Sequence, residues 1–176
     1  MKAIEIVANE GYASLSMRAL ARAGDMKLGA LQYHFPTWRD LVEDLAELIR
    51  TAYADSVTDL TEQGETLEIA ALVGILIDDK PGKSLLSERL LPQLWAMGRV
   101  EPIMGELLHD IYQEYLTTLE DSLRQAGNDN PRAEALSLMS LIEGTTLFMH
   151  EDSPWAKETP AVKALLLASI KEKYGA

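Results

Sequence analysis

The sequence predicts an all-α fold in which a small N-terminal three-helix unit precedes a larger helical domain. Apolar residues recur at the spacing of a helix face along most of the 176 residues. Clusters of Pro, Gly and polar residues separate these periodic segments, and no segment alternates apolar and polar residues as a half-buried strand does. The most informative segment covers residues 15–35, which read LSMRALARAGDMKLGALQYHF.

Residues 15–35 have the pattern of a helix-turn-helix. Ser16 is a suitable N-cap for a first short helix, because its side chain can accept a hydrogen bond from a backbone N–H of the first turn. Gly24 and Asp25 break the helical period, since both residues tolerate the left-handed conformation of a tight turn. A second short helix is expected over 27–35. Such a helix can enter the major groove of DNA, although periodicity alone also fits two ordinary packed helices.

The residues that flank this unit resemble the N-terminal domain of the TetR (tetracycline-repressor-like) family of transcriptional regulators. Ala3, Val7, Gly11 and Tyr12 precede the unit, and the segment 35–41 (FPTWRDL) follows it. The resemblance is specific over residues 3–45 and rests beyond them on length and helical layout. It implies a helix-turn-helix DNA-binding domain at 1–40, with the first turn of its first helix missing, and a helical effector-binding and dimerisation domain at 41–176.

By resemblance, the DNA contacts come from the second helix of the motif and from its flanks. The Gln32 amide can pair with adenine, and Leu28 or Ala30 can contact a thymine methyl group. For Tyr33 and His34, which would hold phosphates, the alternative is packing at the end of a short helix. The expected DNA-binding residues are Ser16, Lys27, Leu28, Ala30, Gln32, Tyr33, His34 and Arg39.

The chain departs from the family pattern at four places. Asp25 replaces the usual turn glycine, and Gln32 stands where the family has Tyr. Trp38 replaces a Lys, which removes one phosphate contact. The first helix begins almost at Met1, so either the native start lies upstream or DNA binding is weaker than in relatives.

Charge is distributed unevenly along the chain. The 28 acidic and 16 basic residues give a net charge of −12, of which residues 1–40 carry +1 and the rest −13. This asymmetry fits a DNA-facing head on an acidic body that phosphates repel. It also predicts weak non-specific DNA binding with a modest salt dependence.

Composition predicts a cytoplasmic helical protein. The chain has no cysteine, which excludes disulfides and thiolate metal sites. No run reaches the ~18 apolar residues of a membrane span. Glu5 and Glu10 interrupt the N-terminal apolar residues too early for a signal peptide.

The body is expected to consist of helices bounded by capping residues and breakers. Thr37 and Asp40 form a possible cap for the first of them, and Pro102 and Pro131 suit the first turns of later ones. Pro92 is expected to kink the helix in which it lies. The predicted helices run from residue 37 to 57 or 60, and over 67–77, 84–97, 102–125, 131–149 and 159–174.

The last two predicted helices indicate a homodimer. Residues 161–170 are apolar nearly all round, and 131–149 carries apolar residues on more than one side. Such helices need a cover on their outer face, so they are either central core helices or half of an intermolecular four-helix bundle. Family resemblance favours the dimer, which would bind a near-palindromic operator. The expected interface residues are Leu138, Ile142, Val162, Leu165, Leu166 and Ser169.

The resemblance also implies a small-molecule effector that enters the body domain and moves the helix after the head. An apolar or aromatic effector is expected because the body is acidic. Glu143 stands out as a charge inside an otherwise apolar helix, which needs a partner or solvent. A Met and aromatic stripe is commonly core, which is the alternative for most candidates. The candidates are Trp95, Met97, Met104, His109, Tyr112, Met139, Glu143 and Thr146.

Two other function classes compete with a regulator. Glu106 and His109 match half of the Glu-x-x-His signature of di-iron helical bundles, but the chain has three histidines and no second such pair. Gly-rich phosphate loops and nucleophile–base spacings are also missing. We therefore expect no enzyme, cofactor or metal. The other alternative is a helical adaptor whose degenerate head no longer binds DNA. The favoured interpretation is a homodimeric, ligand-responsive regulator, a repressor rather than an activator.

Overall fold

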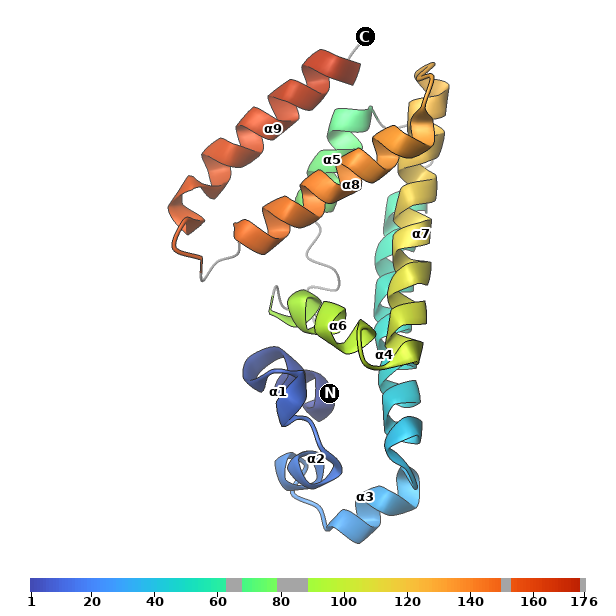
Figure 1. Ribbon diagram of the computed structural model, residues 1–176, viewed down its shortest axis with the longest axis vertical. Helices are drawn as coiled ribbons and strands as arrows, with labels where there is room; N and C mark the ends of the chain where they lie inside the picture. The colour runs from blue at the N-terminus through green and yellow to red at the C-terminus, as the bar shows by residue number, and fades with distance from the viewer. Residues whose placement is uncertain (63–67, 79–88, 150–152, 175–176) are drawn as a thin grey trace. The chain divides into compact units, whose positions relative to one another are not determined.

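The computed structural model of the chain describes residues 1–62, 68–78, 89–149 and 153–174, with side chains left undescribed at 54–62 and 78 (Figure 1). The described residues form helices and contain no strand, so the predicted all-α fold is confirmed. The α-helices are α1 (Lys2–Glu10), α2 (Met17–Ala23), α3 (Leu28–His34), α4 (Trp38–Glu62), α5 (Ile69–Asp78), α6 (Leu90–Gly98), α7 (Pro102–Gln125), α8 (Pro131–Phe148) and α9 (Thr159–Tyr174). Short 3-10 helices lie at Tyr12–Ser14 (η1) and Ala156–Glu158 (η2).

Internal contacts divide the chain into two compact units. Unit 1 consists of Met1–Asp59 and Pro81–Ile111, and therefore holds α1 to α3, most of α4, α6 and the start of α7. Unit 2 consists of Leu60–Lys80 and Tyr112–Ala176, and holds α5, the rest of α7, α8 and α9.

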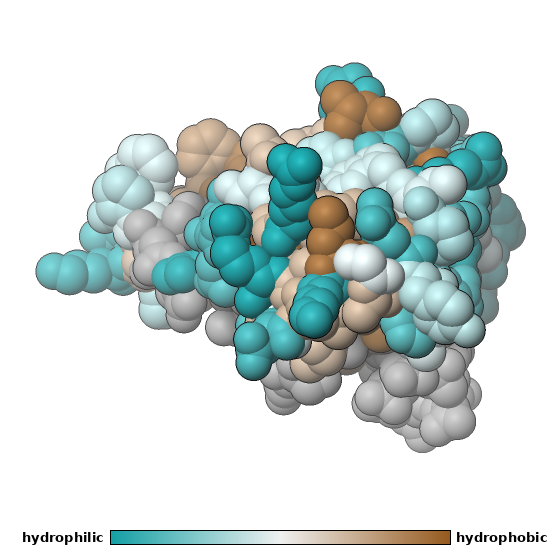
Figure 2. All heavy atoms as spheres, turned by 90° about the horizontal axis from the view of Figure 1, so that it is seen from below, coloured by the Kyte–Doolittle hydropathy of each residue, from teal (hydrophilic) through white to brown (hydrophobic). Residues whose placement is uncertain are grey.

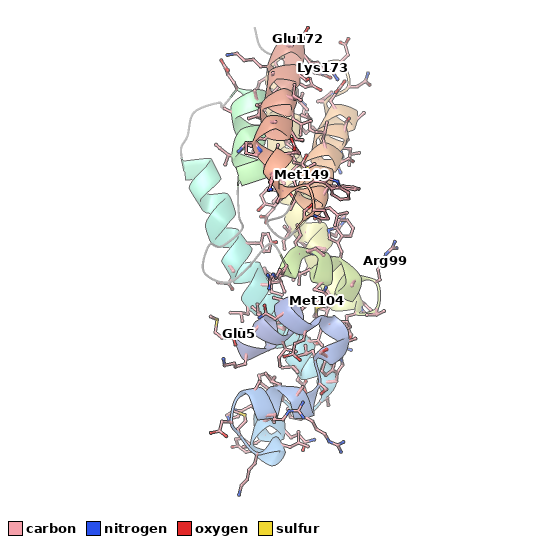
Figure 3. The ribbon with its side chains drawn as sticks, turned by 90° about the vertical axis from the view of Figure 1, so that its left-hand side faces the viewer. Glu5, Arg99, Met104, Met149, Glu172 and Lys173 are labelled. Atoms are coloured by element: carbon pink, nitrogen blue, oxygen red, sulfur yellow. The ribbon has the colours of Figure 1, made fainter. Side chains whose placement is uncertain are left out.

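The core of unit 1 is built from the apolar faces of α1, α4, α6 and α7. α1 packs against α6, and Met104 of α7 lies inside the unit, as Figure 3 shows. Each helix contributes residues three or four positions apart, which is the spacing of one helix face. The least exposed large side chains of this core are Val7, Val42, Ile49, Leu90, Leu94, Met97, Met104 and Leu107.

The helix-turn-helix forms by the local chemistry that its sequence predicts. Ser16 Oγ accepts a hydrogen bond from Ala19 N at 3.1 Å, which satisfies an N–H that the first turn of α2 cannot pair internally. Asp25 has φ 50°, so it occupies the left-handed conformation that the family fills with glycine. Leu20 and Leu31 are buried and anchor the two short helices in the interior of unit 1.

The start of α4 is a reciprocal cap, as the sequence predicts. Asp40 Oδ2 accepts hydrogen bonds from Thr37 N and Thr37 Oγ1, both at 2.7 Å, and Thr37 Oγ1 accepts one from Asp40 N at 3.2 Å. The hydrogen bonds from Thr37 lower the pKa of the Asp40 carboxyl. This cap fixes the direction in which the chain leaves α3.

The α6–α7 turn is tight because two glycines meet there. A Cβ on Gly98 would lie 2.8 Å from Leu108 Cδ1, and one on Gly105 would lie 3.1 Å from the Gly98 carbonyl oxygen.

The predicted kink at Pro92 is wrong. α6 begins at Leu90, so Pro92 lies in the first turn, where a helix needs no N–H from it. The predicted start of this helix, residue 84, lies outside the described residues.

Unit 2 has α5 packed against both α8 and α9. Gly74 of α5 allows a close approach, because a Cβ there would lie 3.6 Å from Leu167 of α9. Glu134 at the start of α8 accepts hydrogen bonds from Lys173 Nζ at 2.7 Å and from the Tyr174 hydroxyl. Figure 3 shows Lys173 at the far end of α9. The expected helices 102–125, 131–149 and 159–174 thus match α7, α8 and α9 to within a residue.

None of the helices in the described part of the chain is long and apolar enough to cross a membrane.

Candidate nucleic-acid interface

Helix α3 buries one residue and exposes most of the others to solvent. Leu31 is 4% exposed and anchors the helix. Tyr33 is 83% exposed, Ala30, Gln32 and His34 are also exposed, and Leu28 is half-buried. The helix therefore presents to solvent most of the residues that the sequence assigns to DNA.

Tyr33 and His34 form a pair at the C-terminal end of α3. Their ring centroids are 5.5 Å apart and the rings meet edge to face at 84°. Neither ring is covered by the core of unit 1, because both residues are exposed. Both rings are therefore accessible to a phosphate, while their contact with each other also fits the alternative, packing at the end of a short helix.

Positive charge flanks α3 on the side of α2. Arg18 and Arg22 are exposed and one helical turn apart on α2, and Lys27 is exposed immediately before α3. Within the described part of the chain, none of the three has an ion-pair partner. Arg18 and Arg22 are not among the DNA-binding residues expected from the sequence. Each lies two positions from the buried Leu20, and the helical period alone therefore places both away from the buried side of α2.

Figure 2 views the molecule from below, the side on which α2 and α3 lie in Figure 1, and hydrophilic side chains project from much of this face.

Two of the residues expected to bind phosphates already form hydrogen bonds within the chain. Arg39 Nε lies 2.6 Å from Glu43 Oε1, and this hydrogen bond raises the pKa of Arg39. Ser16 is exposed and uses its oxygen in the α2 cap. A phosphate must compete with Glu43 for the Arg39 guanidinium.

Trp38, at the position where the resemblance implies a Lys, has an internal partner. Its indole Nε1–H donates to Glu101 Oε1 at 2.9 Å, and its ring centroid lies 6.5 Å from that of Tyr12. The Tyr12 hydroxyl donates to the same Glu101 oxygen. Glu101 was not expected at this site, because nothing in the local sequence shows which distant side chains a turn will face.

The expected effector-binding residues are divided between the two units. Trp95, Met97, Met104 and His109 belong to unit 1, where Met97 and Met104 are buried and the other two are exposed. The remaining four belong to unit 2: Tyr112, Met139, Glu143 and Thr146.

Unit 2 places a partly buried carboxyl group on α8. Glu143 is half-buried, and burial raises the pKa of its carboxyl, while Tyr112 of α7 acts in the opposite direction. The Tyr112 hydroxyl oxygen is itself buried. Glu143 and Tyr112 are therefore polar side chains that unit 2 partly removes from solvent.

The expected dimer residues differ in exposure. Leu138 and Ile142 are buried within unit 2, and Val162 and Leu166 are half-buried. Leu165, 69% exposed, and Ser169 face solvent on α9. Other large apolar residues exposed on α8 and near α9 are Leu136, Leu141, Leu147, Phe148 and Trp155.

A metal centre does not assemble among the described residues, where no three His, Cys, Asp or Glu side chains come together. Glu106 and His109 are both exposed on α7.

An all-α body that carries a helix-turn-helix with an outward-facing second helix is the architecture of TetR-type transcriptional regulators. No protein-family model matches the chain. Among curated proteins, it is similar to the HTH-type transcriptional regulator LmrA of Bacillus subtilis (strain 168), with 26% identity over 152 residues, 78% of this chain and 77% of LmrA.

Solved structures of transcriptional regulators share the fold. A regulator from Rhodococcus sp. Rha1 has a TM-score of 0.78 at 15% identity, over 99% of this chain and 95% of its own. A TetR transcription regulator from Haloarcula marismortui has a TM-score of 0.70 at 14% identity, over 97% and 92%. A transcriptional regulator from Saccharomonospora viridis, in complex with choline, has a TM-score of 0.73 at 18% identity, over 97% and 92%. The predicted TetR-type fold is confirmed, and the relatives agree with the predicted class, a regulator of transcription rather than an enzyme.

Proposed function

We propose that this chain is a ligand-responsive transcriptional regulator, a repressor, that binds a near-palindromic DNA operator as a homodimer. The observation that carries the proposal is α3, which buries Leu31 and exposes its polar and aromatic residues. A helix with one anchored residue and a free outer face fits the major groove of DNA. The curated relative LmrA is itself an HTH-type transcriptional regulator.

In this proposal some residues of α3 and its flanks contact base edges and others contact phosphates. Gln32, Leu28 and Ala30 read base edges, because amide and methyl groups pair with adenine and with the thymine methyl. Phosphates are held by the residues at the two ends of the helix, whose contacts set the register. The expected ones are Ser16, Lys27, Tyr33, His34 and Arg39, and we propose Arg18 and Arg22 as further phosphate contacts because both are exposed cations.

Dimerisation is proposed through α8 and α9. Leu165 and Leu141 are large apolar side chains that face solvent, which a monomer in water does not favour. Burial of such residues against a second copy follows the isologous pattern of a two-fold dimer. Leu138 and Ile142, which are buried, would support this interface by holding α8 in place within unit 2.

The effector is proposed to bind in the domain at 41–176, with the Tyr112–Glu143 pair as its polar recognition group. An apolar or aromatic molecule fits this setting, because a few polar groups in apolar surroundings fix the orientation of such a ligand. The Saccharomonospora viridis regulator, which shares the fold, was solved with choline. A repressor of this kind acts where the DNA is, in the cytoplasm.

The test is selection of DNA duplexes from a random-sequence pool by the purified full-length chain. We expect enrichment of a two-fold symmetric sequence with half-sites about 34–36 Å apart or a multiple of that, bound by two subunits. Enrichment of no sequence, while the chain remains folded, would contradict the proposal and favour the adaptor alternative.

A further inference from the structure

Glu101 accepts hydrogen bonds from residues that lie just before and just after the helix-turn-helix in the sequence. Tyr12 lies in η1, just before α2, and Trp38 is the first residue of α4, just after α3. The Tyr12 hydroxyl and the Trp38 indole N–H both donate to Glu101 Oε1, across 89 and 63 positions of sequence. One carboxylate oxygen therefore holds the entry and the exit of the motif.

Glu101 is itself held firmly in the α6–α7 turn. Its N–H donates to the Met97 carbonyl at 2.8 Å, and its own carbonyl accepts from Met104 N at 3.0 Å and Gly105 N at 3.1 Å. The contact between Gly98 and Gly105 keeps the turn tight. The backbone of Glu101 is therefore fixed on both sides, and the side chain that Tyr12 and Trp38 contact extends from an anchored point of the turn.

A second bond ties Tyr12 to α6. Its backbone N–H donates to Gln93 Oε1 at 3.1 Å, and the preceding Gly11 has φ 85°, a conformation that favours glycine. Burial, with the hydrogen bond to Glu101 as the next cause, raises the pKa of Tyr12 to about 12, so the hydroxyl stays a donor at neutral pH. α1 packs against α6 in the same region.

We propose that Glu101 is a positioning residue that couples the helix-turn-helix to the α6–α7 turn and sets the orientation in which α3 meets DNA. This inference rests on the proposed function. Glu101 does not touch DNA in this account. It acts through Tyr12 and Trp38, and a displacement of the α6–α7 turn reaches both ends of the motif at once. Hydrogen bonds to a carboxylate suit this role, because they are shorter and stronger than neutral ones.

The test compares Glu101→Ala with Glu114→Ala, an exposed acid on α7 in unit 2 whose loss changes the net charge equally. The ligand is the duplex that the wild-type chain selects from the random pool. We expect Glu101→Ala to weaken binding about tenfold, the equivalent of one charge-assisted hydrogen bond, and Glu114→Ala to leave it within about twofold. Binding to scrambled duplex should not change in either variant.

A double-mutant cycle separates positioning from general loss of stability. Tyr12→Phe and Trp38→Phe should each weaken binding about threefold in the wild-type chain and have no further effect in the Glu101→Ala chain. Glu101→Gln, which keeps an acceptor oxygen, should restore most of the affinity. Additive losses, or a Gln variant as weak as the Ala variant, would overturn the role of this oxygen as the shared acceptor.

Hydrogen exchange provides a measurement that does not depend on DNA. Glu101→Ala should speed amide exchange in α2 and α3, which Glu101 does not touch, and leave α8 and α9 unchanged. If the wild-type chain selects no duplex but this pattern appears, the proposed function fails and the coupling stands. Unchanged exchange in α2 and α3, or equal acceleration throughout the chain, would overturn the coupling.

Discussion

The indole N–H of Trp38 donates to Glu101 Oε1 at 2.9 Å, although the family resemblance would place a DNA-contacting Lys at this position. The Trp38 side chain thus forms an internal hydrogen bond where the resemblance implies an outward cation. This bond fixes the start of α4, where the chain leaves the helix-turn-helix.

Replacing Trp38 by Phe keeps an aromatic six-membered ring but removes the N–H donor together with the rest of the indole. We expect a loss of about 1 kcal/mol in the free energy of unfolding, the net value of one hydrogen bond to a partly buried group. Urea denaturation followed by circular dichroism measures it. Trp155→Phe, at an exposed tryptophan, is the matched control. Equal stability of the Trp38 variant and the wild type would show that this bond is not stabilising.

Asp25 occupies a left-handed conformation with φ 50°, which costs any side chain with a Cβ. Asp25→Gly should therefore raise the free energy of unfolding slightly, by about 0.5 kcal/mol, because the greater freedom of glycine in the unfolded chain offsets part of the gain. The thermal midpoint measures the change. Gly24→Asp, at a residue with φ −88°, is the control and should not stabilise. A lower midpoint for Asp25→Gly would mean that the aspartate side chain stabilises this turn.

Stability should depend on pH through Glu143. Burial raises the pKa of this carboxyl above its ordinary value of 4.5, so the folded state favours the protonated form. The contribution of Glu143 to stability is therefore complete below the unfolded-state pKa and is lost as pH rises through the folded-state pKa. Glu143→Gln removes the titration, so the stability of wild type relative to this variant should fall as pH rises above 4.5. Urea denaturation at several pH values measures it, with Glu114→Gln as an exposed control. A difference that stays constant with pH would contradict the burial of this carboxyl.

A charge at Leu165 should separate the proposed dimer. This side chain is 69% exposed on α9, so Leu165→Glu adds no strain to the single chain but would bury a carboxylate against the second copy. Analytical ultracentrifugation should give a mass near 19.5 kDa for the variant and twice that for the wild type. Lys171→Glu, an exposed change on the same helix, should remain dimeric. A dimeric Leu165→Glu chain would place the interface elsewhere.

Local chemistry made much of the fold predictable from the sequence. Ser16, Asp25 and the Thr37–Asp40 cap act within a few residues of themselves, and all lie as expected. Pro92 was expected to kink its helix, but it lies in the first turn of α6, which begins at Leu90. The exposed face of α3 followed from the helical period around Leu31.

The contacts that the sequence could not give are those between distant segments. Glu101 meets Tyr12 and Trp38 only because two glycines tighten the α6–α7 turn, and no pattern near residue 101 shows this. In the same way, periodicity marked α8 as apolar on more than one side, but it could not tell that α5 packs against this helix. Packing partners depend on the orientation of whole helices, which local spacing does not encode.

The most direct test of the central claim is fluorescence anisotropy with the selected duplex and a scrambled duplex at two salt concentrations. It compares three proteins: the wild type, a double variant of α3 that carries both Tyr33→Ala and His34→Ala, and a control double variant. The control carries both Glu114→Ala and Gln125→Ala on the exposed face of α7. We predict that the α3 double variant loses at least roughly 100-fold in affinity for the selected duplex, while the control does not. Its circular dichroism spectrum and its dimeric mass should not change. Unchanged affinity of the α3 double variant would contradict the assignment of α3 as the recognition helix.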